Sequence, residues 1–417
     1  MFPLPTAQPF GSRCARGAAI ALLLAIVACG TTPLSGGRPG GATARPAAPS
    51  PPSAPAEPPP SSVPTPILPV PPLAAPPVVP GEATTRPLPP PVTAQPVTSN
   101  VIALVLPLES AAYGPPAEAV KAGFLAAAKS AGIASRVRVI AHGDDGVLPA
   151  LAAAADAGVA LVVGPLMRDD LKTVLAMAPS RPRMLALNQT DDGLPLPDNV
   201  YSLALTVDND AAQIARVARA EGVRSVGIVA STGALQRRFA AAFAAEWQSS
   251  GQSSAVRYLF DPSLESLGQL RRDLAARPPD AILLAIDSED AALAKSFLPQ
   301  ARVYAVSQIA DDLPPAMLQN LEGVRYVEIP WLANPRSMAS AGPGRTRYEN
   351  PLLERLYALG LDAFALAQMF AEPVPPDRVE LDGATGHLSL TSTRIFSRQG
   401  SLMVIRDGRS IPDPAAP

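Results

Sequence analysis

Cysteine and histidine are scarce in this sequence, which holds only two of each among 417 residues. The histidines are His142 and His387; neither belongs to an HExxH motif, and the two cysteines form no CxxC pair. Protein zinc sites draw about three or four ligands from these residue types at close spacing, so the composition argues against a metal-centred enzyme. No metal ion or other cofactor is expected.

A surplus of basic residues is also missing. Lys and Arg number 34 against 36 Asp and Glu, which gives a formal net charge of -2. Proteins that bind nucleic acid usually carry a basic patch or stripe that neutralises phosphates. Neither DNA nor RNA is therefore expected as a partner.

A catalytic nucleophile is not evident either. A Ser-His-Asp triad would have to use His142 or His387, and neither is accompanied by a serine in a GxSxG motif. We predict no catalytic residue and expect a protein without enzymatic activity.

Proline, by contrast, is abundant, with 51 residues in the chain. Between Pro33 and Pro96 there are 23 prolines in 64 residues. Proline fixes φ and removes a hydrogen-bond donor, so residues 29–98 are predicted to be a disordered tether of polyproline II and coil. Fully extended polyproline II of this length would reach on the order of 200 Å. The alternative is a low-complexity segment with no required length.

The N-terminus has the pattern of a secretory signal peptide over residues 1–28. Arg13 and Arg16 precede an apolar run from Ala18 to Val27, which at about ten residues is too short to cross a bilayer. The following Ala28-Cys29 resembles a lipobox, in which the cysteine is acylated, so Cys29 is the predicted lipidation site. The alternative is ordinary cleavage near Ala28 with an incidental cysteine. Gly30 stands where an inner-membrane lipoprotein has Asp, which favours anchoring in the outer membrane, facing the periplasm.

From Val101 onwards, apolar runs typical of buried strands alternate with amphipathic stretches typical of helices. The predicted strands cover 101–108, 136–141, 159–165, 183–188, 199–205, 225–231, 255–260, 281–287 and 302–308. The predicted helices cover 116–130, 148–156, 169–177, 209–221, 235–249, 264–275 and 290–297. This alternation predicts an α/β protein with helices on both faces of mainly parallel sheets.

The length of the α/β region indicates two lobes. About 300 residues exceed the usual size of a single core, so two doubly wound sheets are expected within residues 99–417. The first lobe should cover about 99–205 together with part of the C-terminal region, and the second about 206–330.

Several segments resemble a known fold. The segments are IALVLPLES, LVVGPLMRDDL, LALNQTD, VGIVASTGALQRRFAAAF and VYAVSQ, and together they are similar to the type I periplasmic-binding-protein fold. A narrower resemblance comes from LLERLYALGLDAFALA followed by LDGATGHLSLTSTRIFSRQGSLMVIRDGRSIP. Over about Val101 to Pro412 the chain resembles the LppC/LpoA family of lipoproteins, which activate class A penicillin-binding proteins.

This resemblance implies a partner and a place of action. A member of the family is a lipoprotein of the outer membrane that contacts a peptidoglycan synthase and stimulates its transpeptidase activity. The best-known members carry a helical-repeat domain before the binding-protein-like domain, whereas this chain has the Pro-rich segment there. The alternative function is that of a periplasmic receptor that delivers an amino acid or another small polar ligand to a transporter.

Polar residues at the predicted carboxyl ends of strands are the candidates for a ligand cleft, because ligands of open α/β sheets gather at that edge. They are Met167, Arg168, Asn188, Gln189, Thr190, Ser231, Thr232, Asp287, Ser307 and Gln308. Amino-acid receptors of this fold hold the ligand carboxylate with a hydroxyl-rich loop, where this chain has Leu166 and Met167. Amino-acid capture is therefore not expected, and the polar residues could instead satisfy loop backbone in a vestigial cleft.

Two tryptophans, Trp247 and Trp331, are the candidate surface anchors for a protein partner. Trp331 begins a stretch rich in Pro, Ser and Gly that runs to Gly344 and that a compact core does not need. Such a loop could form a partner-binding edge or could be mobile without a function.

Overall fold

The computed structural model describes residues 100–177, 182–190, 196–251, 254–311, 313–335 and 348–415. The predicted signal peptide, Cys29 and the Pro-rich tether lie outside the described residues. Most of the stretch from Trp331 to Gly344 lies outside them as well.

The first sheet has five parallel strands in the order β2-β1-β3-β4-β5. They are β1 (Ile102–Leu106), β2 (Val137–Ala141), β3 (Leu161–Val163), β4 (Met184–Ala186) and β5 (Val200–Ser202). All five residues of β1 are buried, because this strand is covered on both faces. A strand in such a position must be apolar along its whole length, which explains the sequence IALVL.

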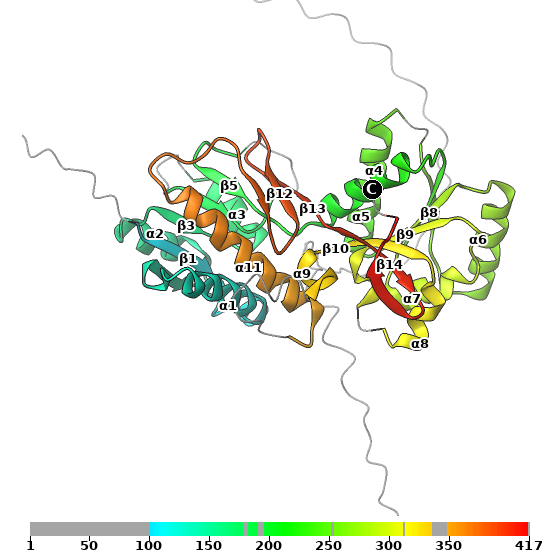
Figure 1. Ribbon diagram of the computed structural model, residues 1–417, viewed down its shortest axis with the longest axis horizontal. Coiled ribbons are helices and arrows are strands. Elements are labelled where there is room, and N and C mark those ends of the chain that lie inside the picture. The colour runs from blue at the N-terminus through cyan, green and yellow to red at the C-terminus, as the bar shows by residue number, and fades with distance from the viewer. Residues whose placement is uncertain are drawn as a thin grey trace, which may run out of the picture. The chain divides into compact units, whose positions relative to one another are not determined.

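Four helices cover the two faces of the first sheet (Figure 1). They are α1 (Gly114–Ser130) and α11 (Pro351–Phe370) on one face and α2 (Leu148–Asp156) and α3 (Arg168–Leu175) on the other. Phe124 of α1 meets Phe364 of α11 edge to face, with ring centroids 5.3 Å apart. A helix from late in the chain thus returns to complete the core of the first sheet.

The second sheet has seven strands in the order β15-β14-β10-β9-β8-β6-β7. They are β6 (Val226–Ala230), β7 (Val256–Leu259), β8 (Ala281–Ala285), β9 (Arg302–Ala305), β10 (Val324–Glu328), β14 (Ser401–Arg406) and β15 (Arg409–Pro412). The strands β6 to β10 run parallel, and the hairpin of β14 and β15 joins β10 in antiparallel pairing. The last strands of the chain therefore extend the second sheet.

Helices also cover both faces of the second sheet. They are α4 (Val207–Ala220) and α5 (Ala234–Ser249) on one face and α6 (Leu264–Ala276) and α7 (Ser288–Lys295) on the other. Shorter helical turns are η1 (Ala134–Arg136), η2 (Ser307–Ala310), α8 (Pro315–Leu318), η3 (Gln319–Leu321) and α9 (Pro330–Ala333).

A small antiparallel sheet follows α11 in the chain. It consists of β11 (Glu380–Asp382), β12 (His387–Leu390) and β13 (Phe396–Gln399). The chain just before β13 also contacts the first sheet, because Ile395 bridges Ser202 of β5 and the Ser202 amide donates to the Arg394 carbonyl at 3.0 Å. This contact covers the β5 edge of the five-stranded sheet.

The two mainly parallel, doubly wound sheets predicted from the sequence are confirmed. The strand and helix positions agree closely, and the helix predicted over 148–156 has those bounds in the structure. Within the described ranges, no helix combines the length and apolar character that crossing a membrane requires.

Candidate functional site

Three of the residues predicted to line a cleft hold the loops after β3 and β4 together. The Asn188 side chain donates through Nδ2 to the Leu166 carbonyl at 2.9 Å and accepts at Oδ1 from the Gln189 amide at 2.9 Å. Arg168 donates through Nε to the Gln189 carbonyl at 3.1 Å. The structure thus brings Arg168, Asn188 and Gln189 together. Nε of Arg168 and both Nδ2 and Oδ1 of Asn188 are hydrogen-bonded to protein backbone.

The other two predicted residues of this lobe, Met167 and Thr190, are half-buried. Met167 is the extended residue that precedes α3, and the first turn of that helix carries Asp170. Asp170 is buried beside His142, with its Oδ2 3.8 Å from Nε2 of the imidazole. Neither of these two atoms has a hydrogen-bond partner among the described residues, and burial raises the pKa of the Asp170 carboxyl.

In the second lobe, three predicted residues lie in loops at the carboxyl ends of β6 and β8. Ser231 is half-buried, while Thr232 and Asp287 are exposed. Two side chains of α5 connect these loops, because Arg237 donates to the Thr232 carbonyl and Gln236 donates to the Asp287 carboxylate. Thr232 and Asp287 are thus held by two adjacent residues of the same helix turn.

The last two predicted residues, Ser307 and Gln308, begin η2 after β9. Ser307 is buried, and Oε1 of Gln308 is a buried atom without a hydrogen-bond partner in the described part of the chain. The turn ends at Asp311, whose carboxylate binds a side chain of α11.

That side chain is Arg355, which joins α11 to the second sheet. Its guanidinium donates to the Asp311 carboxylate at 2.6 and 2.9 Å and to the Glu328 carboxylate of β10 at 2.5 and 3.1 Å. Arg355 and Glu328 are 6% and 7% exposed, so this is a buried ion pair. Burial raises the pKa of Glu328 above its ordinary value despite the neighbouring guanidinium. Because α11 also packs on the first sheet, the pair connects the two sheets.

A second buried ion pair connects the small antiparallel sheet to a helix that covers the second sheet. Arg398 of β13 pairs with Asp210 of α4, and it also donates to the Thr385 carbonyl at 3.2 Å. Asp210 is 6% exposed, and burial raises the pKa of its carboxyl, although Arg398 opposes this change.

Asp362 is a further buried acid, and it has no arginine within hydrogen-bond distance in the described residues. Its carboxylate accepts hydrogen bonds from the backbone amides of Ala384 and Thr385, both at 2.7 Å, and from the Thr385 hydroxyl at 2.5 Å. Burial raises the pKa of Asp362 to about 6. These bonds fix the loop between β11 and β12 against α11.

Sequence reasoning missed these buried acids and arginines, although one signal pointed to them. The helix α11 has 20 residues and only three charged ones, Glu354, Arg355 and Asp362, within a largely apolar sequence. All three are buried. Isolated charges in an apolar helix are expected to have buried partners.

The prediction that Trp247 and Trp331 are surface anchors is wrong. Trp247 is fully buried in the core between α4, α5 and the second sheet, where it stacks near Phe243 at 5.9 Å. Trp331 is 1% exposed and donates through Nε1 to the buried Glu354 carboxylate at 2.7 Å. Both indoles stabilise the fold.

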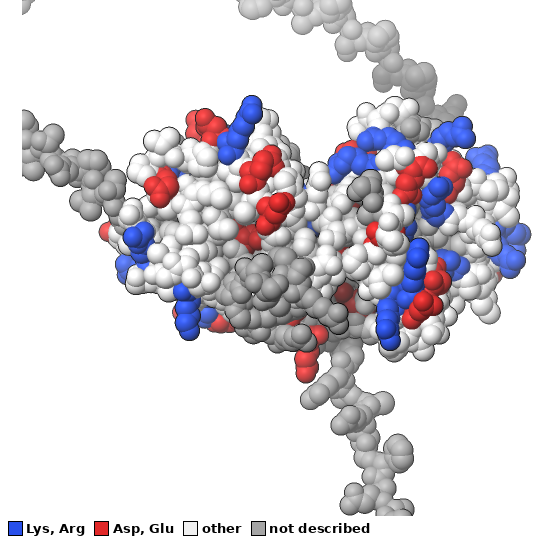
Figure 2. Space-filling view, in the orientation of Figure 1, with Lys and Arg blue, Asp and Glu red and all other residues white. Residues whose placement is uncertain are grey.

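Surface charge and possible metal ligands are further features of the described residues that could mark a site. Acidic and basic side chains are interspersed on the visible face in Figure 2. Across the described ranges, no three His, Cys, Asp or Glu side chains gather where they could hold a metal ion. A surface hollow of about 520 Å³ lies between α7, α8 and η3, and none of the predicted cleft residues lines it.

Comparison with known proteins identifies the family. The family model described as LppC putative lipoprotein matches residues 92–408. The penicillin-binding protein activator LpoA of Edwardsiella ictaluri is 27% identical over 363 residues, which are 76% of this chain and 52% of that protein. The LpoA of Pectobacterium parmentieri is 28% identical over 69% of this chain and 50% of its own length. The chain thus spans about half the length of these curated relatives.

Solved structures agree on the fold. The C-domain of LpoA from Haemophilus influenzae, described as a regulator of PBP1A, has a TM-score of 0.64 and 23% identity, with 75% of this chain and 99% of that domain covered. A protein of Chromobacterium violaceum described as a putative branched-chain amino acid ABC transporter has a TM-score of 0.62 and 34% identity, covering 73% of this chain and 99% of its own. The fold is therefore that of type I periplasmic binding proteins, as the sequence segments predicted. Since the family model spans well over half of the sequence, the chain belongs to the LppC lipoprotein family.

Proposed function

We propose that this protein binds and activates a class A penicillin-binding protein without catalysing a reaction itself. The observation that carries the proposal is the LppC match, together with relatives that are named penicillin-binding protein activators. In addition, 75% of this chain matches 99% of the LpoA C-domain described as a regulator of PBP1A. An activator works by contact with its partner, so it needs a stable folded surface more than a reactive side chain.

We also propose that Cys29 carries the lipid and anchors the protein in the outer membrane, facing the periplasm. Acyl chains on this cysteine would contribute roughly 0.8 kcal/mol of membrane affinity for each buried methylene. The Pro-rich residues 29–98 would then extend the folded domain towards a synthase in the inner membrane.

A receptor for a small ligand is the competing function, and one observation favours it: the 34% identity with the Chromobacterium violaceum protein. The loops at the carboxyl ends of β3 and β4 argue the other way. The Arg168 and Asn188 side chains each donate to the backbone of the other loop, which leaves fewer polar atoms for a ligand.

Affinity capture tests the proposed partner. The lipidated full-length chain serves as bait in detergent-solubilised envelopes, and a Cys29→Ser variant serves as the control for anchoring. We expect a class A penicillin-binding protein to be retained by both forms, because the folded domain supplies the contact. In cells, only the acylated form should fractionate with the outer membrane. Retention of a transport permease in place of the synthase would favour the receptor.

Two further experiments separate the parts of the proposal. Deleting Pro46 to Pro90 while keeping Cys29 should reduce activation in cells, because the domain would no longer reach its partner. Unchanged activation would show that reach is not the role of the tether. Calorimetric titration with a panel of amino acids should give no heat of binding, and micromolar affinity for one of them would support the receptor function.

A further inference from the structure

The outermost strand of the second sheet, β7, has one side without a neighbour. It is the last strand in the sheet order and pairs only with β6 among the described residues. Backbone groups along a strand alternate between its two sides, and the Phe260 amide donates inward to the Ala230 carbonyl at 2.9 Å. The backbone groups of Arg257 and Leu259 therefore point away from the sheet, where another strand could pair with them.

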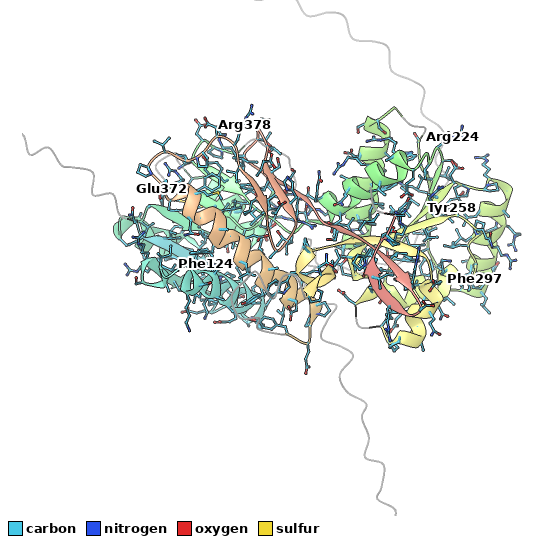
Figure 3. The ribbon with its side chains drawn as sticks, in the orientation of Figure 1. Phe124, Arg224, Tyr258, Phe297, Glu372 and Arg378 are labelled. Atoms are coloured by element: carbon cyan, nitrogen blue, oxygen red, sulfur yellow. The ribbon has the colours of Figure 1, made fainter. Side chains whose placement is uncertain are left out.

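Large apolar side chains are exposed along this edge. Leu259 at the end of β7 is 74% exposed, and Leu264 at the start of α6 is 77% exposed. Val256 at the start of the strand is 44% exposed. Tyr258, labelled in Figure 3, instead packs with the core beneath α6. Side chains alternate between the two faces of a strand, so Val256 shares a face with Tyr258, and Leu259 shares the other face with Arg257. Leu259 and Leu264 are thus two highly exposed apolar side chains within six residues at the end of this edge strand.

The corresponding edge of the first sheet, β2, is different. Arg138 on this strand and Arg136 just before it are exposed, and the exposed large apolar residue of the strand, Val139, reaches only 36%. Charged side chains on an edge strand prevent pairing with other chains. At the C-terminal end of β7 the exposed residue is the apolar Leu259, so this end of the strand has no charged side chain that would prevent pairing.

The exposed cation on β7 indicates the charge of a partner. Arg257 lies in the middle of the strand, is exposed, and has no ion-pair partner within the described ranges. An incoming strand with an acidic side chain opposite Arg257 would gain a cross-strand pair of opposite charge. Its apolar side chains could cover Leu259 and Leu264.

We propose that an extended segment of the penicillin-binding protein adds a strand to β7, with a carboxylate near Arg257 and apolar side chains over Leu259 and Leu264. This inference rests on the proposed function and specifies the surface that performs it. Main-chain hydrogen bonds to the outward groups of Arg257 and Leu259 would supply affinity, and the side chains would supply specificity.

Substitution at Leu259, with binding measured between the full-length protein and a purified class A penicillin-binding protein in detergent, tests the proposal. Leu259→Lys places a charge on the edge and should weaken the affinity at least about tenfold. Leu259→Pro removes an outward amide that takes no part in the sheet, so it should weaken binding similarly without unfolding the protein. Arg257→Glu should weaken binding through charge reversal.

The edge of the first sheet supplies matched controls. Val139→Lys and Arg138→Glu make the same changes on β2 and should alter the affinity less than about twofold. Thermal unfolding of each variant must match that of the wild type, so that lost binding reports the surface and not the fold. Wild-type affinity retained by all three β7 variants would overturn the inference while leaving the proposed function intact.

The remaining outcomes are equally decisive. If the wild-type protein binds no class A penicillin-binding protein at all, the proposed function itself fails. If sedimentation shows a dimer that Leu259→Lys dissociates while synthase binding is unchanged, the edge pairs with a second copy of this chain, and the inference is wrong.

Discussion

Gly123 of α1 and Gly360 of α11 allow the two helix backbones to touch. A Cβ atom on Gly123 would lie 2.0 Å from the Tyr357 carbonyl oxygen, and one on Gly360 would lie 2.2 Å from the Val120 carbonyl oxygen. No real Cβ contact is that short, so only glycine fits at either position. The pair sets the spacing of the helices that cover one face of the first sheet.

The first prediction follows from this contact. Gly360→Ala should reduce the free energy of unfolding by about 2–3 kcal/mol, because a methyl group would force the helices apart. Gly268→Ala is the matched control on α6, where the nearest atom to a new Cβ is an arginine side-chain nitrogen at 3.6 Å. That change should be neutral or stabilise the protein by up to about 1 kcal/mol through helix propensity. Urea denaturation measures both, and equal effects would contradict the packing argument.

The second prediction concerns the ion pair between the sheets. Arg355→Met should destabilise the protein by about 3–5 kcal/mol, because it leaves the Glu328 carboxylate buried without its cation. Arg216 pairs with Glu246 at 3.4 Å on the surface, where the two side chains are 42% and 28% exposed. Arg216→Met should therefore cost less than about 1 kcal/mol. If the two variants unfold at the same denaturant concentration, the buried pair of Arg355 and Glu328 does not stabilise the contact between α11 and the second sheet.

The third prediction is a pH dependence centred on Asp362. Its pKa is raised to about 6 in the folded protein, from an ordinary value of 3.8. The folded state therefore holds this proton more tightly, so the stabilisation is complete below pH 4 and is lost as the pH rises through 6. The donors that face the carboxylate are Ala384 and Thr385, and Arg398 acts on it from β13.

Asp362→Asn removes that titration and provides the comparison. The wild type should exceed the variant in stability by more at pH 4 than at pH 7, with a difference between the two values of about 2 kcal/mol. Asp280 supplies a contrast, since hydrogen bonds from the Arg224 and Ser225 amides lower its pKa. Its contribution should be present at neutral pH and lost on acidification. A constant gap between wild type and Asp362→Asn across this range would contradict a raised pKa at Asp362.

The elements of the fold were predictable because their signals are local. A run such as Ile102 to Leu106 is apolar throughout since the strand is covered on both faces. Trp247 also had a local signal that was not used: it follows Phe239 and Phe243 at intervals of four, which places all three on one buried helix face. Periodicity of this kind can be detected within one segment, without knowing how distant segments pack.

The polar connections between the sheets could not be predicted in the same way. Arg355 meets Glu328 across 27 residues of sequence, and Arg398 meets Asp210 across 188. Trp331 is buried because Glu354 and Tyr357 return to it from α11. Such contacts depend on how distant segments pack, and no pattern within one segment encodes them. The cleft residues stay a prediction, although Arg168 and Asn188 donate to backbone carbonyls that join the loops after β3 and β4.

Cross-linking of peptidoglycan by a purified class A penicillin-binding protein tests the central claim most directly. The synthase is incubated with lipid II, with and without the full-length lipidated protein at a saturating concentration, and the share of cross-linked muropeptides is measured. The account predicts a clear rise in cross-linking that heat-denatured protein does not produce. Unchanged cross-linking by every class A synthase of the same cell, under conditions where an LpoA relative stimulates its own synthase, would contradict it.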